Sequence, residues 1–84
     1  MRSLKINEYN SNVNYFQLSK ELCIKGTLNA DHGNLKGALD NFNKAIKADP
    51  TNYAAYYNRA TIKIDLGNIK GARKDFSTFV MLRK

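Results

Sequence analysis

The sequence predicts an all-α fold of antiparallel helix-turn-helix units, about two of them, that follow an N-terminal extension. The prediction rests on a stretch that recurs along the chain, on apolar residues at helical spacing, and on turn-forming residues between the apolar stripes. The stretch GNLKGALDNF begins at Gly33 and returns as GNIKGARKDF at Gly67, a period of 34 residues (67 minus 33). A fixed period of this length is typical of stacked supersecondary units, each unable to bury its apolar side alone.

The helix after Gly33 is predicted from apolar residues that recur three and four positions apart, which places them along one side of a helix. These residues are Leu35, Ala38, Leu39, Phe42, Ala45 and Ile46. Asp49 and Pro50 follow directly. Because proline lacks an amide hydrogen and disfavours helical geometry in the residue before it, the helix is expected to end here.

Two further helices are predicted beyond Pro50. The first carries one stripe and three residues that widen it: Tyr53, Tyr56, Tyr57, Ala60 and Ile64, with Ala55, Ile62 and Leu66. Such broad coverage suits a helix that packs on two sides. Gly67 and Asn68 make a turn, since glycine accepts the left-handed conformation that closes a helix. The last stripe consists of Ile69, Ala72, Phe76, Phe79 and Val80.

The two units are predicted at residues 19–52 and 53–84, and residues 1–18 form the extension. Two interpretations of the extension stay open. The residues around Leu4 resemble the end of a preceding unit, in which case the first helix begins near Ser11. Alternatively, the asparagine-rich start is a frayed tail.

Several residues match the pattern of a known helical-repeat family, W-x2-L-G-x2-Y followed by A-x3-F and a closing proline. Both A-x3-F elements are present, and the first unit has the proline: Ala38 to Phe42, Ala72 to Phe76, and Pro50. The chain therefore resembles a tetratricopeptide repeat protein. It departs from the pattern in the first helix of each unit, where Leu22 and Tyr56 stand in the place of tryptophan.

The resemblance implies an α-solenoid in which the first helices of successive units line a concave groove that binds a peptide or a partner protein. Transferred by repeat position, the groove residues are Lys20, Ile24, Thr27, Tyr57, Asn58 and Thr61. The amide of Asn58 can hold a peptide backbone, and Tyr57 offers an apolar surface with a polar tip. The alternative for Asn58 is a structural hydrogen bond to the neighbouring unit.

The last helix is expected to pack on another surface because its residues stay apolar to Leu82. Repeat arrays usually need about three units to bury a continuous core, and only two are recognisable. We therefore expect a homo-oligomer, most simply a dimer about a two-fold axis, that self-associates through Phe79, Val80 and Leu82, unless the chain is a fragment of a longer array.

No catalytic, metal or cofactor site is expected. His32 lies in a predicted turn beside Asp31, without a serine or cysteine nucleophile nearby. Cys23 has Lys20 one turn away, so a reactive thiol and simple packing are the alternatives. One cysteine and one histidine do not supply the four ligands of a zinc site. The sequence therefore predicts a protein that is not an enzyme.

The composition points to an acidic partner or a polyanion as an alternative. Fourteen Lys and Arg against seven Asp and Glu give a formal net charge of +7. An RNA or acidic-protein binder would use the second helices of the units, with Lys36, Lys44, Lys47, Lys70, Arg73 and Lys74. Because most aromatic residues belong to apolar stripes, few remain to stack on bases, and nucleic acid is the less expected partner.

The lone cysteine and the absence of a signal peptide or membrane span predict a cytoplasmic protein.

Overall fold

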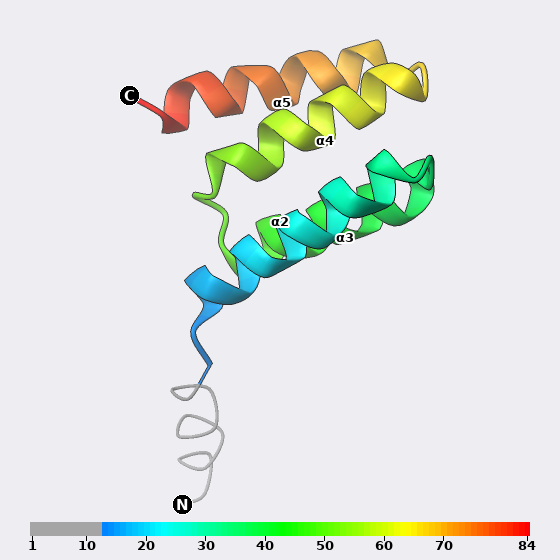
Figure 1. Cartoon of the computed structure of the whole chain (residues 1–84). Helices are drawn as coiled ribbons and strands as arrows, with labels where there is room; N and C mark the ends of the chain where they lie inside the picture. Colours follow the sequence, from blue (N-terminus) through cyan, green and yellow to red (C-terminus); the bar gives the residue numbers. More distant parts are fainter. Residues whose placement is uncertain (1–12) are drawn as a thin grey trace, which may run out of the picture.

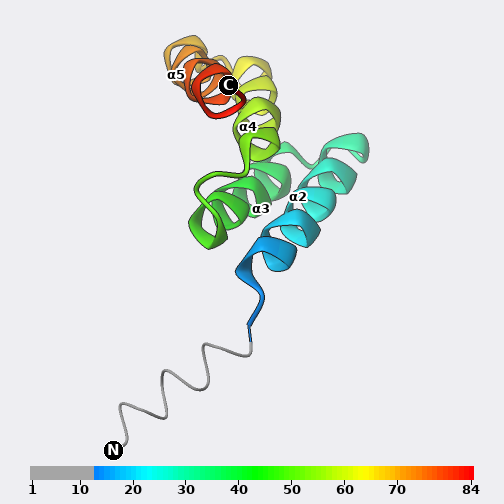
Figure 2. The same cartoon turned by 90° about the vertical axis from the view of Figure 1, so that its left-hand side faces the viewer.

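The computed structural model describes residues 13–84, which form four α-helices in two antiparallel pairs (Figures 1 and 2). The helices are α2 (Tyr15–Asp31), α3 (Leu35–Ala48), α4 (Tyr53–Asp65) and α5 (Ile69–Leu82). α2 pairs with α3 and α4 pairs with α5, and α4 lies across the first pair. The predicted all-α class and its two helix-turn-helix units are confirmed.

The first described helix begins at Tyr15, inside the stretch that the sequence assigned to the extension. Asn14 caps it, since its side-chain oxygen accepts the backbone N–H of Gln17 at 3.0 Å. Residues 1–12 lie outside the described part of the chain. The two interpretations of the chain's start, including a helix from Ser11, therefore stay predictions.

The recurring stretch works as a turn and a helix cap. Gly33 and Gly67 have φ angles of 79° and 86°, the left-handed region that glycine enters without strain. The following Asn34 accepts the backbone N–H of Gly37 at 2.9 Å and so satisfies one free donor of the helix start. A Cβ at Gly37 would collide with this asparagine side chain. Both glycines of the stretch are therefore required by the geometry of the cap.

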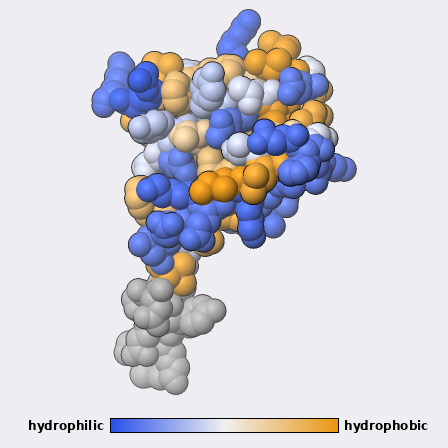
Figure 3. Space-filling model, viewed as in Figure 1, coloured by the Kyte–Doolittle hydropathy of each residue, from blue (hydrophilic) through white to orange (hydrophobic). Residues whose placement is uncertain are grey.

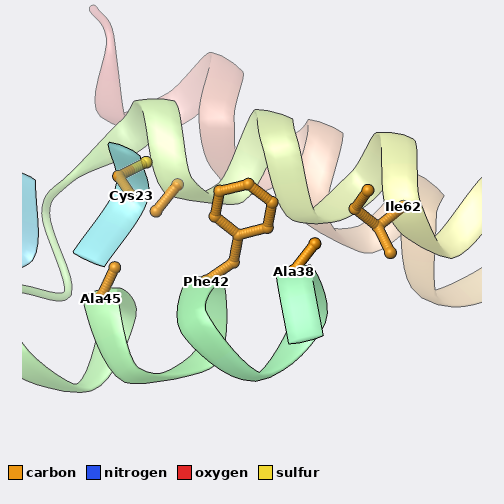
Figure 4. Packing of buried hydrophobic residues seen from close by; sticks show 6 residues of the cluster. Cys23, Ala38, Phe42, Ala45 and Ile62 are labelled. Carbon is orange, nitrogen blue, oxygen red and sulfur yellow. The ribbon is translucent and has the colours of Figure 1, made fainter. Parts of the chain in front are cut away.

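The core lies between α2, α3 and α4 and is centred on Phe42, which is 1% exposed (Figure 4). The buried residues that surround it are Cys23, Ala38, Ala45, Ala55 and Ile62. A Cβ at Gly26 would lie 2.5 Å from Cε1 of Phe42, so the glycine lets α2 approach the ring. Small residues on three helices thus make room for one large aromatic side chain.

Buried Ser19 connects the first unit to the start of the second. Its hydroxyl donates to the carbonyl oxygen of Ala45 at 2.7 Å and accepts the side-chain N–H of Asn52 at 2.9 Å. Asn52 also caps α4 through the backbone N–H of Ala55. The cap of the second unit is therefore fixed by a side chain from the first.

The burial along α4 differs from the predicted stripe. Ala55, Ala60 and Ile62 are buried, whereas Tyr53 and Tyr57 are nearly half exposed. The difference arises because α4 turns the side with Ala55 and Ile62 toward the first unit, while the rings of the two tyrosines contact phenylalanines of α5. Tyr53, Tyr57 and Ile64 of the predicted stripe are thus exposed, whereas Ala55 and Ile62, which were predicted to widen it, belong to the core.

Helix α5 contains a buried acid that the apolar pattern did not predict. Asp75 is 3% exposed and receives hydrogen bonds from Nε and Nη2 of Arg59 at 2.8 and 2.7 Å. Nζ of Lys63 lies 3.0 Å from Oδ2 of Asp75, the same oxygen that accepts from Nε of Arg59. The same Arg59 donates through Nη1 to the side-chain oxygen of Asn43 at 3.0 Å, which ties α4 to α3. This ion-pair cluster joins three helices and both units.

Candidate functional site

The predicted groove residues lie on α2 and α4, the first helices of the two units, and differ in exposure. Lys20, Ile24, Thr27 and Tyr57 are exposed, whereas Asn58 and Thr61 are partly buried. Ile24 is 61% exposed and Tyr57 is 45% exposed, so both offer apolar surface to a partner. Lys20, Ile24, Thr27 and Tyr57 are therefore the groove residues of α2 and α4 that are most available to a partner.

Asn58 makes a structural hydrogen bond to the neighbouring unit, which was the alternative to a role in ligand binding. Its side-chain N–H donates to Sγ of Cys23 across α2 and α4, at 3.6 Å. The hydroxyl of Thr61 donates to the carbonyl oxygen of Asn58 at 2.7 Å, and that of Thr27 to the carbonyl oxygen of Cys23 at 3.1 Å. The amide therefore has a structural role, which leaves its oxygen as the atom that can receive a hydrogen bond from a ligand.

The environment of Cys23 favours packing over reactivity. Burial raises the pKa of its thiol above the ordinary value, and the hydrogen bond from Asn58 lowers it by less. The thiol therefore stays protonated at neutral pH, and a thiolate is the form that reacts. Cys23 is one of the buried residues around Phe42 rather than a nucleophile.

A hollow of about 260 Å³ opens at the groove where the N-terminal halves of α2 and α4 approach each other. It is lined by Phe16, Lys20, Thr51, Asn52, Tyr53 and Ala54. Nζ of Lys20 lies 4.9 Å from the centre of the Phe16 ring, so the ammonium group makes a cation–π contact at the edge of the hollow. The hollow can accept an apolar side chain and place a negative charge beside Lys20.

Sequence reasoning found Lys20 but missed the aromatic walls of this hollow. Phe16 lies in the stretch assigned to the extension, and Tyr53 was assigned only to the apolar stripe of its helix. A signal for Tyr53 exists in the repeat, because it aligns with Ser19 (53 minus 34), a residue too small to reach the groove. The replacement of a small serine in the first unit by a large tyrosine in the second indicates that the two aligned side chains have different surroundings.

The residues predicted for self-association occupy three environments. Phe79 belongs to an aromatic cluster, with its ring centre 5.9 Å from that of Tyr53 and 5.0 Å from that of Tyr57. Val80 is 54% exposed, and Leu82 is partly buried. Only Val80 of the three is thus largely available on the surface.

The basic residues of the second helices lie apart from the exposed aromatic residues. Lys36, Lys44 and Lys47 are on α3, and Lys70, Arg73 and Lys74 are on α5, all of them exposed. Lys44 pairs with Asp40 at 3.3 Å. The exposed aromatic residues of the described chain are Tyr15, Phe16, Tyr53 and Tyr57, on α2 and α4. A nucleic acid on the basic helices would therefore find no exposed ring beside the cations on which a base could stack.

The other sites considered from the sequence have plain structural roles in residues 13–84. His32 is the C-cap of α2, and its Nδ1 donates to the carbonyl oxygen of Leu28 at 2.8 Å. In this range no group of three or more His, Cys, Asp or Glu side chains is placed to hold a metal ion. None of the four helices is long and apolar enough to cross a membrane.

Comparison with known proteins gives the family of the chain. The profile of a tetratricopeptide repeat family matches residues 30–74, more than half of the sequence. Over 53 residues the chain is 42% identical to a tetratricopeptide repeat protein 36 homolog of Nematostella vectensis, covering 63% of this chain and 29% of that protein. Over 52 residues it is 44% identical to DnaJ homolog subfamily C member 3 of Gallus gallus, covering 62% of this chain and 10% of that protein.

The chain thus spans less than a third of the length of the curated relatives that it matches. No solved structure gives a significant match. The matched family agrees with the period, with the paired helices and with the burial of Ala38, Phe42 and Ala72 from the two A-x3-F elements. The chain belongs to the tetratricopeptide repeat family.

Proposed function

We propose that the protein is a non-catalytic interaction module that binds a peptide of a partner protein along α2 and α4. Membership of a family whose domains generally mediate contacts between proteins supports this proposal. The observation that carries it is the hollow between Phe16, Lys20 and Tyr53. Its aromatic walls suit an aliphatic or aromatic side chain, and the ammonium of Lys20 suits a carboxylate next to it.

The rest of the groove supports the same ligand. Ile24 and Tyr57 continue the apolar surface, and the side-chain oxygen of Asn58 can accept a backbone N–H of an extended peptide. The ligand class is therefore a short segment that combines one apolar anchor with an acidic group. A cytoplasmic protein is consistent with the unpaired and buried Cys23.

Peptide selection from a random display library tests this proposal. The selected peptides are expected to carry a carboxylate next to an apolar residue. Lys20→Glu is expected to weaken their binding at least tenfold, about 1.4 kcal/mol, because it replaces the attraction to the carboxylate with repulsion. Isothermal titration calorimetry in dilute solution measures the change.

The matched control is Lys74→Glu, which makes the same charge change on exposed α5. It is expected to change the affinity by less than about twofold, the effect of net charge alone after screening by salt. Peptides that bind both variants equally well, or a selection that yields no peptide, would contradict the proposal.

Self-association is a second candidate function, and exposed apolar residues at both ends of α5 support it. Ile69 at its start and Val80 near its end are each more than half exposed, as are Leu66 just before the first and Met81 just after the second. Exposed apolar clusters of this kind are typical of surfaces that meet another protein surface. We propose that the last helix contributes to a contact between two copies of the chain.

A further inference from the structure

The outer side of the second unit has a small apolar cavity of about 160 Å³. It is lined by Ile64, Ile69, Ala72, Arg73 and Phe76. Hydrophobic residues gather in this region, where α4 ends and α5 begins, at the upper right of Figure 3. An apolar cavity of roughly 150 Å³ can hold a benzene molecule, so this one has room for a single aliphatic side chain.

In the first unit the corresponding place is filled. Subtracting 34 aligns Ala72 with Ala38 and Phe76 with Phe42. On these two residues of the first unit packs Ile62 of α4, which is 3% exposed (Figure 4). The contact between α3 and α4 therefore shows which kind of residue the cavity of the second unit accepts.

Helix α2 presents that kind of residue on its surface. Ile62 aligns with Leu28 (62 minus 34), and Leu28 is 52% exposed. Ile24 and Leu18 lie one and about three turns before Leu28, at 61% and 37% exposure. Hydrophobic surface also runs along α2 in Figure 3. We name Leu18, Ile24 and Leu28 the head face, and the cavity together with Tyr53 and Tyr57 the tail face.

We propose that the tail face of one copy binds the head face of a second copy, so that the contact between α3 and α4 is repeated between two chains. The inference deepens and rests on the self-association part of the proposed function, and its two faces share Ile24, Tyr53 and Tyr57 with the peptide groove. It places Leu28 of the second copy in the cavity beside Ile69 and Phe76. Each added chain would extend the stack by its two pairs of helices.

The contacts inside the chain translate into matched contacts between copies. A pair between copies is obtained by subtracting 34 from the residue of the second unit and adding 34 to the residue of the first. The hydrogen-bonded pair of Asn58 and Cys23 then corresponds to Ile24 of the second copy against Tyr57 of the first. In the same way, the pair of Asn52 and Ser19 corresponds to Leu18 against Tyr53. Each polar pair inside the chain thus becomes an apolar pair of exposed residues. Arg59 bonds Asn43, and the aligned pair, Lys25 and Ser77, is again polar.

A further aligned position, which is apolar inside the chain, becomes charged between copies. Buried Ala55 aligns with Glu21, and its neighbour Ala45 aligns with Phe79. The guanidinium of Arg83 lies 5.3 Å from the centre of the Phe79 ring. Glu21 of the second copy would therefore meet a cation, and this opposite charge favours the same register.

The charge on α5 disfavours the two-fold arrangement expected from the sequence. Lys70, Arg73 and Lys74 are exposed on α5, and the one acid of that helix, Asp75, is already paired with Arg59 and Lys63. Packing α5 against its own copy would bring these cations together without an acid to offset them. The exposed charges of α2 near the head face are of both signs, Glu21 against Lys20 and Lys25, so this face repels the basic α5 less than a second copy of α5 would.

A contact between two different faces leaves one face free at each end, so copies add in a row. The test uses one variant for each face, Leu28→Asp and Ile69→Asp, with substitutions at residues that are both more than half exposed. Sedimentation velocity is expected to show concentration-dependent growth of the wild type. Each variant alone is expected to stay monomeric, with at least a tenfold loss of association.

An equimolar mixture of the two variants is expected to form a heterodimer that grows no further, because each variant keeps the face that the other lacks. The control is Met81→Asp, which is expected to associate like the wild type, since the aligned Lys47 is exposed in the first unit. Helical circular dichroism equal to that of the wild type shows that the variants are folded.

Two results would overturn the inference. A wild type that stays monomeric at high micromolar concentration would leave the tail face to a different protein. Association that survives Leu28→Asp, with no heterodimer in the mixture, would establish the two-fold contact instead. Neither result bears on the peptide titration with Lys20→Glu, which is done in dilute solution.

Discussion

Replacing Phe42 with alanine is expected to lower the free energy of unfolding by about 3–5 kcal/mol. The ring is 1% exposed and lies between α2, α3 and α4, so its removal leaves a cavity that three helices border. Because α4 belongs to the second unit, the loss also weakens the contact between the units. Urea unfolding followed by helical circular dichroism measures the difference.

Phe76→Ala is the matched control, since Phe76 aligns with Phe42 (76 minus 34). This ring is only partly buried and lines the open cavity of the tail face. Its removal is expected to cost clearly less in dilute solution, because less apolar surface returns to water. An equal loss for the two variants would contradict the description of the second unit as open on its outer side.

Replacing Asp75 with asparagine is expected to lower the free energy of unfolding at neutral pH by about 3 kcal/mol. The change leaves Arg59 and Lys63 without their shared acid, and both side chains are only 19% exposed. Uncompensated charge in a partly buried place is costly even when the substituted residue has the same shape. Urea unfolding at neutral pH measures this loss.

The pH dependence of the free energy of unfolding, compared between the wild type and Asp75→Asn, is a second test of the role of this acid. Burial alone would raise the pKa of Asp75, but the hydrogen bonds from Arg59 and Lys63 and their charges outweigh it, so the pKa is lowered on folding. A lowered pKa contributes stability that is complete above the pKa of the unfolded chain, about 3.9, and is lost as the pH falls through the folded value. The difference between wild type and Asp75→Asn is therefore expected to narrow below about pH 4.

Asp40→Asn serves as the control for this experiment. Asp40 also pairs with a lysine, Lys44, but the two side chains are 65% and 60% exposed. Removing an exposed pair of this kind is expected to change stability by less than about 0.5 kcal/mol. Equal effects at Asp40 and Asp75, or a difference at Asp75 that does not depend on pH, would contradict the assigned role of the buried acid.

The helices and turns were predictable because their causes are local. A glycine with positive φ followed by an asparagine cap is written directly in the recurring stretch, and Pro50 ends its helix by its own covalent structure. The buried positions of α3 were predictable for the same reason, since one helix with one packed side has a simple period.

The packing of α4 was not predictable in the same way. Which side of α4 turns to the first unit depends on the angle between the two units, and the period of a single helix does not contain that angle. The exposure of Tyr53, a residue of the predicted apolar stripe, therefore did not follow from the sequence, and the aromatic wall of the hollow was missed. The groove position of Lys20 came only from the resemblance to the family.

The buried acid was missed because a single charged residue on an amphipathic helix normally marks the solvent side. The repeat nevertheless contains a signal. Asp75 and Lys63 align with Asn41 and Asn29, whose side chains share a hydrogen bond in the first unit. A neutral pair in one unit and a charged pair in the next, at the same two positions, indicates that the side chains meet.

The central claim is that a partner peptide lies along α2 and α4. Backbone amide chemical shifts in a ¹H–¹⁵N spectrum, recorded during titration with a selected peptide, test it most directly. The account predicts that the largest shifts fall on residues that line the hollow and groove, with Lys20, Tyr53 and Thr61 among them. Shifts confined to the second helices, at residues such as Lys36 and Lys74, would contradict it and would favour the alternative of a polyanion or acidic ligand on the basic helices.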